Sequence, residues 1–140
     1  NLILIIKDNI NLLKELDKNI NIELISDKDE IIFNSDYEQL SRVFMNLIKN
    51  SIESIQSKKQ NIHDFIGKIT LVLNENDDYI EFTIVDNGEG FASFKNNVTT
   101  KEKGTGLGLA IVNKILNDHN SSIDFIKIDN GAKIFIKFKK

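Results

Sequence analysis

Three glycines at alternate positions run directly into a helical pattern, and this junction restricts the possible folds of the chain more than any other segment. Gly104, Gly106 and Gly108 are followed by apolar residues at helical spacing from Leu109 to about residue 118. Glycine lets backbone N–H groups approach an anion closely, and the first turn of a helix offers unpaired donors at the positive end of its dipole. The junction therefore predicts a helix start that binds phosphate; a flexible loop before a helix is the structural alternative.

The bulk composition narrows the classes of function open to the chain. With 140 residues it is long enough for one core, and we expect residues 1–140 to form a single domain. The net charge of −3 provides no basic surface for nucleic acid, and no apolar run approaches the roughly 18 residues needed to span a bilayer. The absence of cysteine excludes disulfides, thiolate metal sites and cysteine nucleophiles. We therefore expect a domain that contacts neither nucleic acid nor membrane.

Hydrophobic periodicity predicts helices alternating with pairs of strands. The expected helices are residues 2–16, 36–56 and 106–118, and the expected strands are residues 20–25, 31–34, 68–74, 79–85, 122–128 and 132–139. Asp36 is placed to cap the second helix, and Gln39 completes a capping-box pattern. This order predicts an α+β fold, a two-layer α/β sandwich in which about three helices cover one face of a mixed, mostly antiparallel sheet.

Two asparagines stand one turn apart on the expected helix 36–56. Asn46 and Asn50 lie at the margin of its apolar face, where side chains can point into a cleft, and Glu53 continues that edge. A carboxamide oxygen can ligate Mg²⁺ and leave the remaining positions to water and phosphate oxygens. The pair therefore indicates a Mg²⁺ site; two solvated asparagines in an Asn-rich chain are the alternative.

A carboxylate follows the last apolar residue of the expected strand 79–85. Asp86 begins the sequence Asp-Asn-Gly-Glu-Gly, whose glycines Gly88 and Gly90 let the backbone turn against a planar ligand. The carboxylate can accept a hydrogen bond from an exocyclic amine. An Asn-Gly hairpin turn is the alternative, although residues 91–97 do not alternate as a returning strand would.

These three motifs, in this order, resemble the ATP-binding catalytic domain of sensor histidine kinases, in the superfamily that includes gyrase, Hsp90 and MutL ATPases. The motifs that carry the resemblance are an N box at Gln39–Ile55, a first glycine box at Asp86–Gly90 and a second glycine box at Gly104–Leu109. The second box is neither a Rossmann fingerprint nor a P-loop. Residues 98–112 and the pair Asp118-His119 look most like nitrogen-regulatory kinases. The implied architecture is a Bergerat-type ATP-binding fold.

The resemblance implies a role for each motif. Asn50 would hold Mg²⁺, Asp86 would contact the adenine amine, the backbone of the second glycine box would hold the triphosphate, and residues 91–105 would form an ATP lid. The implied ATP-binding residues are Asn46, Asn50, Asp86, Gly88, Gly90, Thr99, Thr100, Lys101, Lys103, Gly104, Thr105, Gly106, Leu107, Gly108 and Leu109. The implied catalytic residues are Asn46 and Asn50. Gyrase-like ATPases carry glutamate at position 46 to activate water; a carboxamide is a poor base, which favours phosphoryl transfer over hydrolysis.

A histidine kinase also needs a phosphoacceptor histidine, and neither histidine of this chain has the expected context. His63 lies in a polar loop and His119 ends a helix. The resemblance therefore implies an acceptor and dimerisation hairpin before Asn1 and a response regulator receiver domain as partner. It also implies a cytoplasmic domain, monomeric when isolated, whose parent protein can be anchored in the inner membrane.

Two other functions fit the same motifs. An anti-sigma-factor type serine kinase lacks the acceptor hairpin and is about this size. A non-catalytic nucleotide-binding or interaction module would keep the fold without transferring phosphate. Transfer to a supplied acceptor domain separates these alternatives from the histidine kinase hypothesis.

Overall fold

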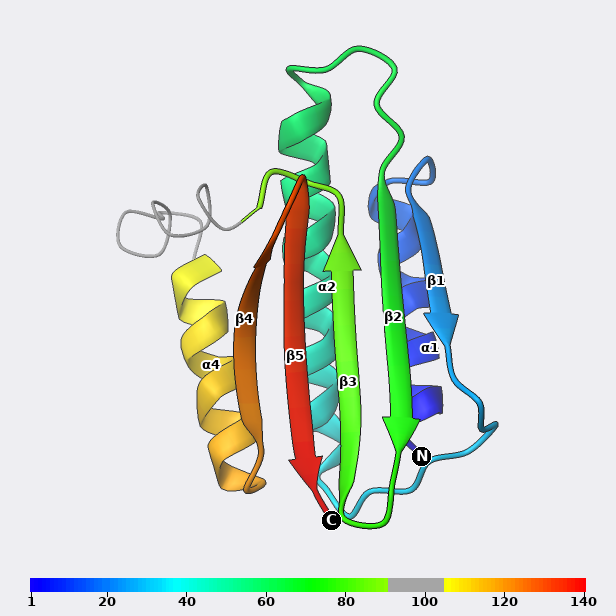
Figure 1. The fold of residues 1–140 in the computed structure, drawn as a ribbon, viewed down its shortest axis with the longest axis vertical. Coiled ribbons are helices and arrows are strands. Elements are labelled where there is room, and N and C mark those ends of the chain that lie inside the picture. The colour runs from blue at the N-terminus through cyan, green and yellow to red at the C-terminus, as the bar shows by residue number, and fades with distance from the viewer. Residues whose placement is uncertain (91–104) are drawn as a thin grey trace.

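The computed structural model describes residues 1–90 and 105–140, with side chains from residue 108 onward in the second range (Figure 1). The elements are α1 (Leu2–Leu13), the 3₁₀ turn η1 (Lys14–Leu16), β1 (Asn21–Ile25), α2 (Tyr37–Lys59), β2 (Lys68–Glu75), β3 (Tyr79–Asp86), α4 (Thr105–Asp118), β4 (Ser122–Ile128) and β5 (Gly131–Lys139). Figure 1 shows the helices behind a single open sheet. The predicted two-layer α/β sandwich is confirmed.

The sheet has the order β1-β2-β3-β5-β4. Its β1 and β2 are parallel, and every other neighbouring pair is antiparallel, as the predicted mixed and mostly antiparallel sheet requires. The β2–β3 turn is closed by the side chain of Asn76, which accepts hydrogen bonds from Asp78 N and Tyr79 N. Because β3 is central, both of its edges are already paired where it ends at Asp86.

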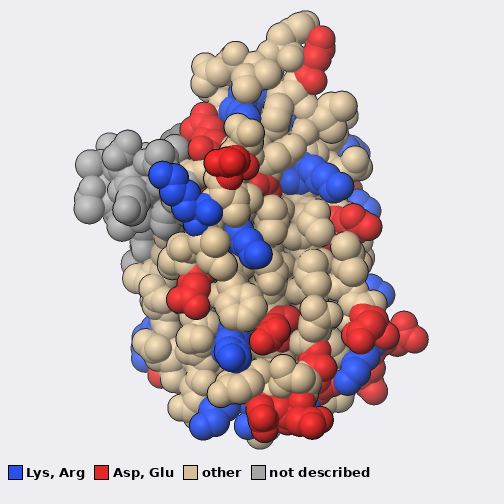
Figure 2. Space-filling view, viewed as in Figure 1, with Lys and Arg blue, Asp and Glu red and all other residues tan. Residues whose placement is uncertain are grey.

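The core lies between the sheet and α2. Alternate residues of β3 point toward the helices and are buried, among them Phe82, which meets Phe44 of α2 edge-on with ring centroids 5.1 Å apart. Figure 2 shows the opposite face of the sheet, where uncharged side chains fill the middle and charged ones lie around them. Thr83 and Phe135 on that face are half-buried. Among the described residues, no helix has the length and hydrophobicity to cross a membrane.

The expected strand at residues 31–34 is wrong. This segment forms no strand; instead, the carbonyl oxygen of Ile31 accepts a hydrogen bond from Leu2 N at 2.8 Å, and Ile31 is fully buried. Ile31 is therefore apolar because it is buried beside the start of α1, and not because it pairs with a neighbouring strand. The helix expected at 2–16 ends at Leu13 and continues as the turn η1.

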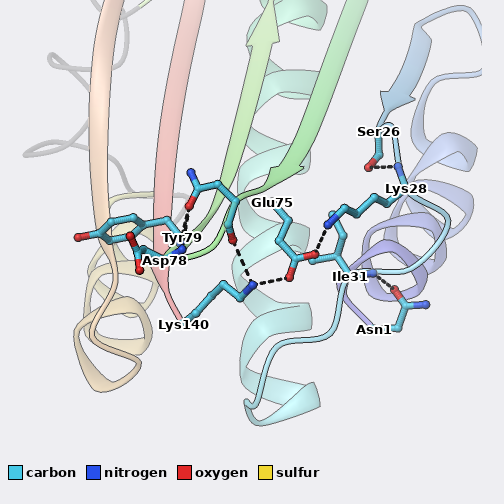
Figure 3. A network of polar contacts seen from close by, with 9 residues as sticks. Asn1, Ser26, Lys28, Ile31, Glu75, Asp78, Tyr79 and Lys140 are labelled. Atoms are coloured by element: carbon cyan, nitrogen blue, oxygen red, sulfur yellow. Dashed lines mark hydrogen bonds and ion pairs between the residues drawn. The ribbon is translucent and has the colours of Figure 1, made fainter.

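A polar network closes the end of the sheet away from Asp86 (Figure 3). Glu75, the last residue of β2, accepts from Lys28 Nζ at 2.8 Å and pairs with Lys140 Nζ at 2.9 Å. The hydrogen bond from Lys28, followed by that from Lys140, lowers the pKa of Glu75. The network joins the segment before α2 and the chain end to the β2–β3 turn.

We expect Asp36→Ala to lower the free energy of unfolding by about 1 kcal/mol. Asp36 is the N-cap of α2, and its Oδ1 accepts from Gln39 N at 3.0 Å. Alanine leaves that N–H without its partner, whereas Asp36→Asn keeps a capping oxygen and serves as the control. Urea unfolding followed by circular dichroism measures both variants. A loss as large for Asn as for Ala would contradict the capping role.

Candidate functional site

Asp86 is a buried carboxylate at the end of β3. It follows Phe82 and Ile84 on the side of the strand that faces α2, and only 6% of its surface is exposed. Its Oδ1 accepts from Gly88 N at 2.8 Å, and the Ser51 hydroxyl also hydrogen-bonds to the carboxylate. Burial raises the pKa of Asp86 above its usual range, and these two hydrogen bonds offset only part of that effect. The carboxylate is therefore a fixed acceptor held among polar groups of α2.

The segment that follows Asp86 lies against α2 and does not form a hairpin. Glu89 N donates to Ser54 Oγ at 2.9 Å, and Ser57 Oγ donates to the Glu89 carboxylate at 2.9 Å. Gly88 packs so closely on Ser54 that a Cβ at position 88 would overlap the serine side chain. A returning strand would also lack an edge, because β2 and β5 flank β3 up to Asp86. The hairpin alternative is therefore excluded.

Asn46 and Asn50 are half-buried on α2, one turn apart as predicted. Asn46 Nδ2 donates to the carbonyl oxygen of Arg42 at 2.9 Å, which directs the amide nitrogen back to the helix. A Cβ placed on Gly108 of α4 would lie 2.9 Å from Asn46 Oδ1. The glycine therefore lets α4 approach the amide oxygen of Asn46 closely.

The predicted residues of the lid and of the second glycine box are described only in part. Thr105, Gly106 and Leu107 lie in the first turn of α4, and Leu109 is buried. Thr99, Thr100, Lys101, Lys103 and Gly104 lie outside the described residues, as does the expected lid apart from Thr105. In the first glycine box, Gly90 has a φ of 86° and lies beside the carbonyl oxygen of Gly131.

The structure thus brings together parts of the three sequence motifs. The C-terminal half of α2, the end of β3 and the start of α4 lie at the same end of the molecule, toward the top of Figure 1. No group of three or more His, Cys, Asp or Glu side chains suited to a metal occurs in the part of the chain that the structure describes. The amide oxygens of Asn46 and Asn50 are neutral ligands of the kind that a cation accepts beside a ligand's own anions.

Several residues of the site are not among those predicted from the sequence. Ser51, Ser54 and Lys58 contact the first glycine box from α2, and their spacing of three and four residues places them along one side of the helix. Polar residues at this spacing, beside the apolar face of a helix, could have indicated in the sequence that this side of α2 contacts the first glycine box. The role of Gly131 could not be seen in the sequence, which indicates a turn glycine there, whereas in the structure Gly131 packs against the backbone of Asp86.

The comparisons with known proteins agree with this geometry. Residues 35–140 match the family described as histidine kinase-, DNA gyrase B- and HSP90-like ATPases. An NtrY-like sensor histidine kinase of Rickettsia prowazekii is 36% identical over 144 residues, covering 98% of this chain and 23% of that protein. The chain therefore spans about a quarter of the length of this relative.

Two solved structures share the fold. The nucleotide-free catalytic domain of the histidine kinase ThkA is 26% identical, with a TM-score of 0.82 over 100% of this chain and 93% of that chain. ThkA in complex with the response regulator protein TrrA is 21% identical, with a TM-score of 0.76 over 100% of this chain and 40% of that chain. With the family match, these likenesses show that the chain belongs to the histidine kinase-, DNA gyrase B- and HSP90-like ATPases, among the catalytic domains of sensor histidine kinases.

Proposed function

We propose that this domain binds Mg-ATP at the end of β3 and transfers the γ-phosphoryl group to a histidine on a separate acceptor hairpin. The observation that carries the proposal is the buried carboxylate of Asp86, fixed by Gly88 N and by Ser51, the residue that follows Asn50 on α2. A buried, oriented acceptor of this kind suits the exocyclic amine of adenine, because removal from water strengthens a charge-assisted hydrogen bond.

The amides of α2 suit the phosphate end of the nucleotide. Asn46 has its amide nitrogen engaged by Arg42, so its oxygen is the atom left to face α4, and Asn50 lies one turn further along the same helix. Both offer neutral oxygens, the kind of ligand that Mg²⁺ accepts beside phosphate. We propose that Asn50 holds Mg²⁺ directly; the ion supplies charge neutralisation at the transferred phosphoryl group. The start of α4 supplies backbone donors to the triphosphate.

The choice between transfer and hydrolysis rests on position 46. Asn46 is a carboxamide and has no basic oxygen with which to deprotonate water. The carboxylate on the same edge of α2, Glu53, is exposed and stands seven residues, about two turns, beyond Asn46, and the Ser51 hydroxyl is engaged by Asp86. Positioning and charge neutralisation remain as the means of catalysis, which suits an in-line transfer to an incoming imidazole.

The partners belong to the same proposal. ThkA is described in complex with the response regulator protein TrrA, and that description applies to ThkA. For this chain we propose an acceptor hairpin of the parent kinase and a receiver domain as the next phosphate acceptor. The serine kinase alternative has less support, because the relative that covers nearly the whole chain is described as a sensor histidine kinase.

Phosphotransfer in trans tests this function. The chain is mixed with Mg-ATP labelled in the γ-phosphate and with a separately produced acceptor hairpin of an NtrY-like sensor kinase. We expect label on the hairpin that is stable to base and labile to acid, as for phosphohistidine. Acid-stable label on a serine would support the serine kinase alternative, and nucleotide binding without any label would support the non-catalytic module.

We expect Asn50→Ala to slow this transfer by about 100-fold or more, because it removes the proposed Mg²⁺ ligand. Asn113→Ala is the control, since Asn113 is exposed on α4. Initial rates of hairpin labelling at several Mg²⁺ concentrations measure the effect, and a higher Mg²⁺ requirement is expected for Asn50→Ala. Equal rates in the two variants would exclude Asn50 from the metal site.

A further inference from the structure

Two hydrogen bonds fix the peptide group between Asn87 and Gly88 from opposite sides. Its carbonyl oxygen accepts from Lys58 Nζ at 3.0 Å, and its N–H donates to Asp86 Oδ1 at 2.8 Å. The C=O and N–H of a trans peptide point in opposite directions within one plane, and the described residues contain no cis peptide bond. Lys58 and Asp86 therefore determine the orientation of the same plane.

The next peptide group is held in a similar way. The carbonyl oxygen of Gly88 accepts from Lys58 Nζ at 3.3 Å, and Glu89 N, on the other side of that plane, donates to Ser54 Oγ at 2.9 Å. One ammonium group thus contacts both carbonyls that flank Gly88. Its position is fixed further by the Phe65 ring, whose centroid lies 4.8 Å from Nζ.

The orientation of the Asn87–Gly88 peptide matters because glycine allows that plane to rotate at little steric cost. A rotated peptide would direct the Asn87 carbonyl oxygen at the carboxylate of Asp86 and remove the Gly88 N–H that now stabilises it. Repulsion between the two oxygens would turn the carboxylate away from its present position. The charge-assisted bonds from Lys58 oppose this rotation, and such bonds are about twice as strong as neutral ones.

We propose that Lys58 is a positioning residue for adenine recognition: it holds the peptides around Gly88 so that the carboxylate of Asp86 faces the exocyclic amine. This inference rests on the proposed function. Lys58 acts through the peptides of Asn87 and Gly88, and its charge also offsets part of the rise in the pKa of Asp86 that burial causes. The sequence offers a matched neighbour, Lys59, whose Nζ instead bonds Oδ2 of Asp17, the residue after η1, at 2.9 Å.

The test compares two nucleotides in calorimetric titrations. Mg-ATP carries the exocyclic amine, whereas the magnesium complex of inosine triphosphate carries a carbonyl oxygen at the same ring position. We expect the wild type to prefer ATP, and Lys58→Met to lose about tenfold in ATP affinity with little change for the inosine nucleotide. Lys59→Met should keep the wild-type preference, and Lys58→Arg should restore most of it, since a guanidinium can reach both carbonyls.

Each outcome separates this inference from the proposed function. A wild type that binds neither nucleotide overturns the proposed function and this inference with it. A wild type that prefers ATP, together with a Lys58→Met variant that keeps the preference or weakens both nucleotides equally, overturns only the positioning role. Lys58→Gln keeps a donor group on a shorter side chain and provides an independent test. A preference for ATP between those of the wild type and Lys58→Met supports the positioning role, and an unchanged preference contradicts it.

Discussion

Asp86→Asn is expected to lower the affinity for Mg-ATP by about 100-fold or more and to leave the fold intact. In the variant, the amide oxygen can keep the hydrogen bond from Gly88 N, but the group left for adenine is then an N–H donor facing another donor. The folded state meanwhile no longer has to bury a charge, and burial is the largest influence on the pKa of Asp86. We therefore expect thermal stability at neutral pH equal to or higher than that of the wild type.

The same substitution should change two pH dependences. The pKa of Asp86 is raised in the folded state, so the folded chain binds this proton more tightly than the unfolded chain. The contribution of Asp86 to the free energy of unfolding consequently decreases as the pH rises from the ordinary pKa of an aspartate through the raised pKa, and this decrease is absent in Asp86→Asn. Mg-ATP affinity should fall as the pH falls through the same range, because the protonated carboxyl is a weaker acceptor.

Urea unfolding and nucleotide titration over a pH series measure both effects on one pair of proteins. Glu75→Gln is the control, since Glu75 pairs with Ile80 at the end of β3 away from Asp86 and hydrogen bonds lower its pKa. Its contribution has the opposite sign: stability present above the unfolded pKa is lost as the pH falls. Unchanged ATP affinity in Asp86→Asn would refute the assignment of Asp86 to adenine.

Gly131→Ala is expected to destabilise the fold by about 3 kcal/mol or more, and to weaken nucleotide binding as well. A Cβ at Gly131 would overlap the carbonyl oxygen of Asp86 and lie 3.0 Å from its carbonyl carbon. Both are backbone atoms in the paired region of β3 and β5, where Asp86 is in register with Ala132. Relief of the overlap must therefore move the strand that carries Asp86.

Gly108→Ala makes an informative comparison. There the new methyl group would meet the Asn46 side chain, which can shift, and alanine is favoured over glycine inside a helix by about 0.5–1 kcal/mol. We expect Gly108→Ala to keep or gain stability while it displaces the Asn46 amide and weakens Mg-ATP binding. Urea unfolding measures the free energy of unfolding of both variants. Equal losses in Gly131→Ala and Gly108→Ala would contradict the expectation that overlap with backbone atoms costs more than overlap with a side chain.

Much of the fold could be predicted because local patterns and tertiary structure agree. The alternation in β3 and the cap at Asp36 specify a strand and a helix start that the structure contains. The strand predicted at residues 31–34 is absent for a physical reason: Ile31 is buried beside the start of α1, Phe33 packs on Phe138, and short apolar runs do not distinguish burial from strand pairing. Strand order was beyond local patterns, because β1 pairs with β2 across the whole length of α2.

The candidate site, like the fold, could be predicted from the sequence only in part. Asp86, Asn46 and Asn50 could be predicted because they stand in motifs whose order along the chain resembles that of a known family. The hydrogen bonds from Lys58 to two carbonyl oxygens could not be predicted from the sequence. Lysine is common, and its contacts depend on how the chain folds after β3. Backbone interactions leave almost no trace in side-chain patterns.

Calorimetric titration of Mg-ATP into the wild-type chain tests the central claim most directly. Saturable binding of one nucleotide per chain, lost when Asp86 is replaced by Asn in a protein of unchanged circular dichroism, is the result we predict. Absence of binding by the folded wild-type chain, or equal binding by Asp86→Asn, would contradict a nucleotide site built on the end of β3.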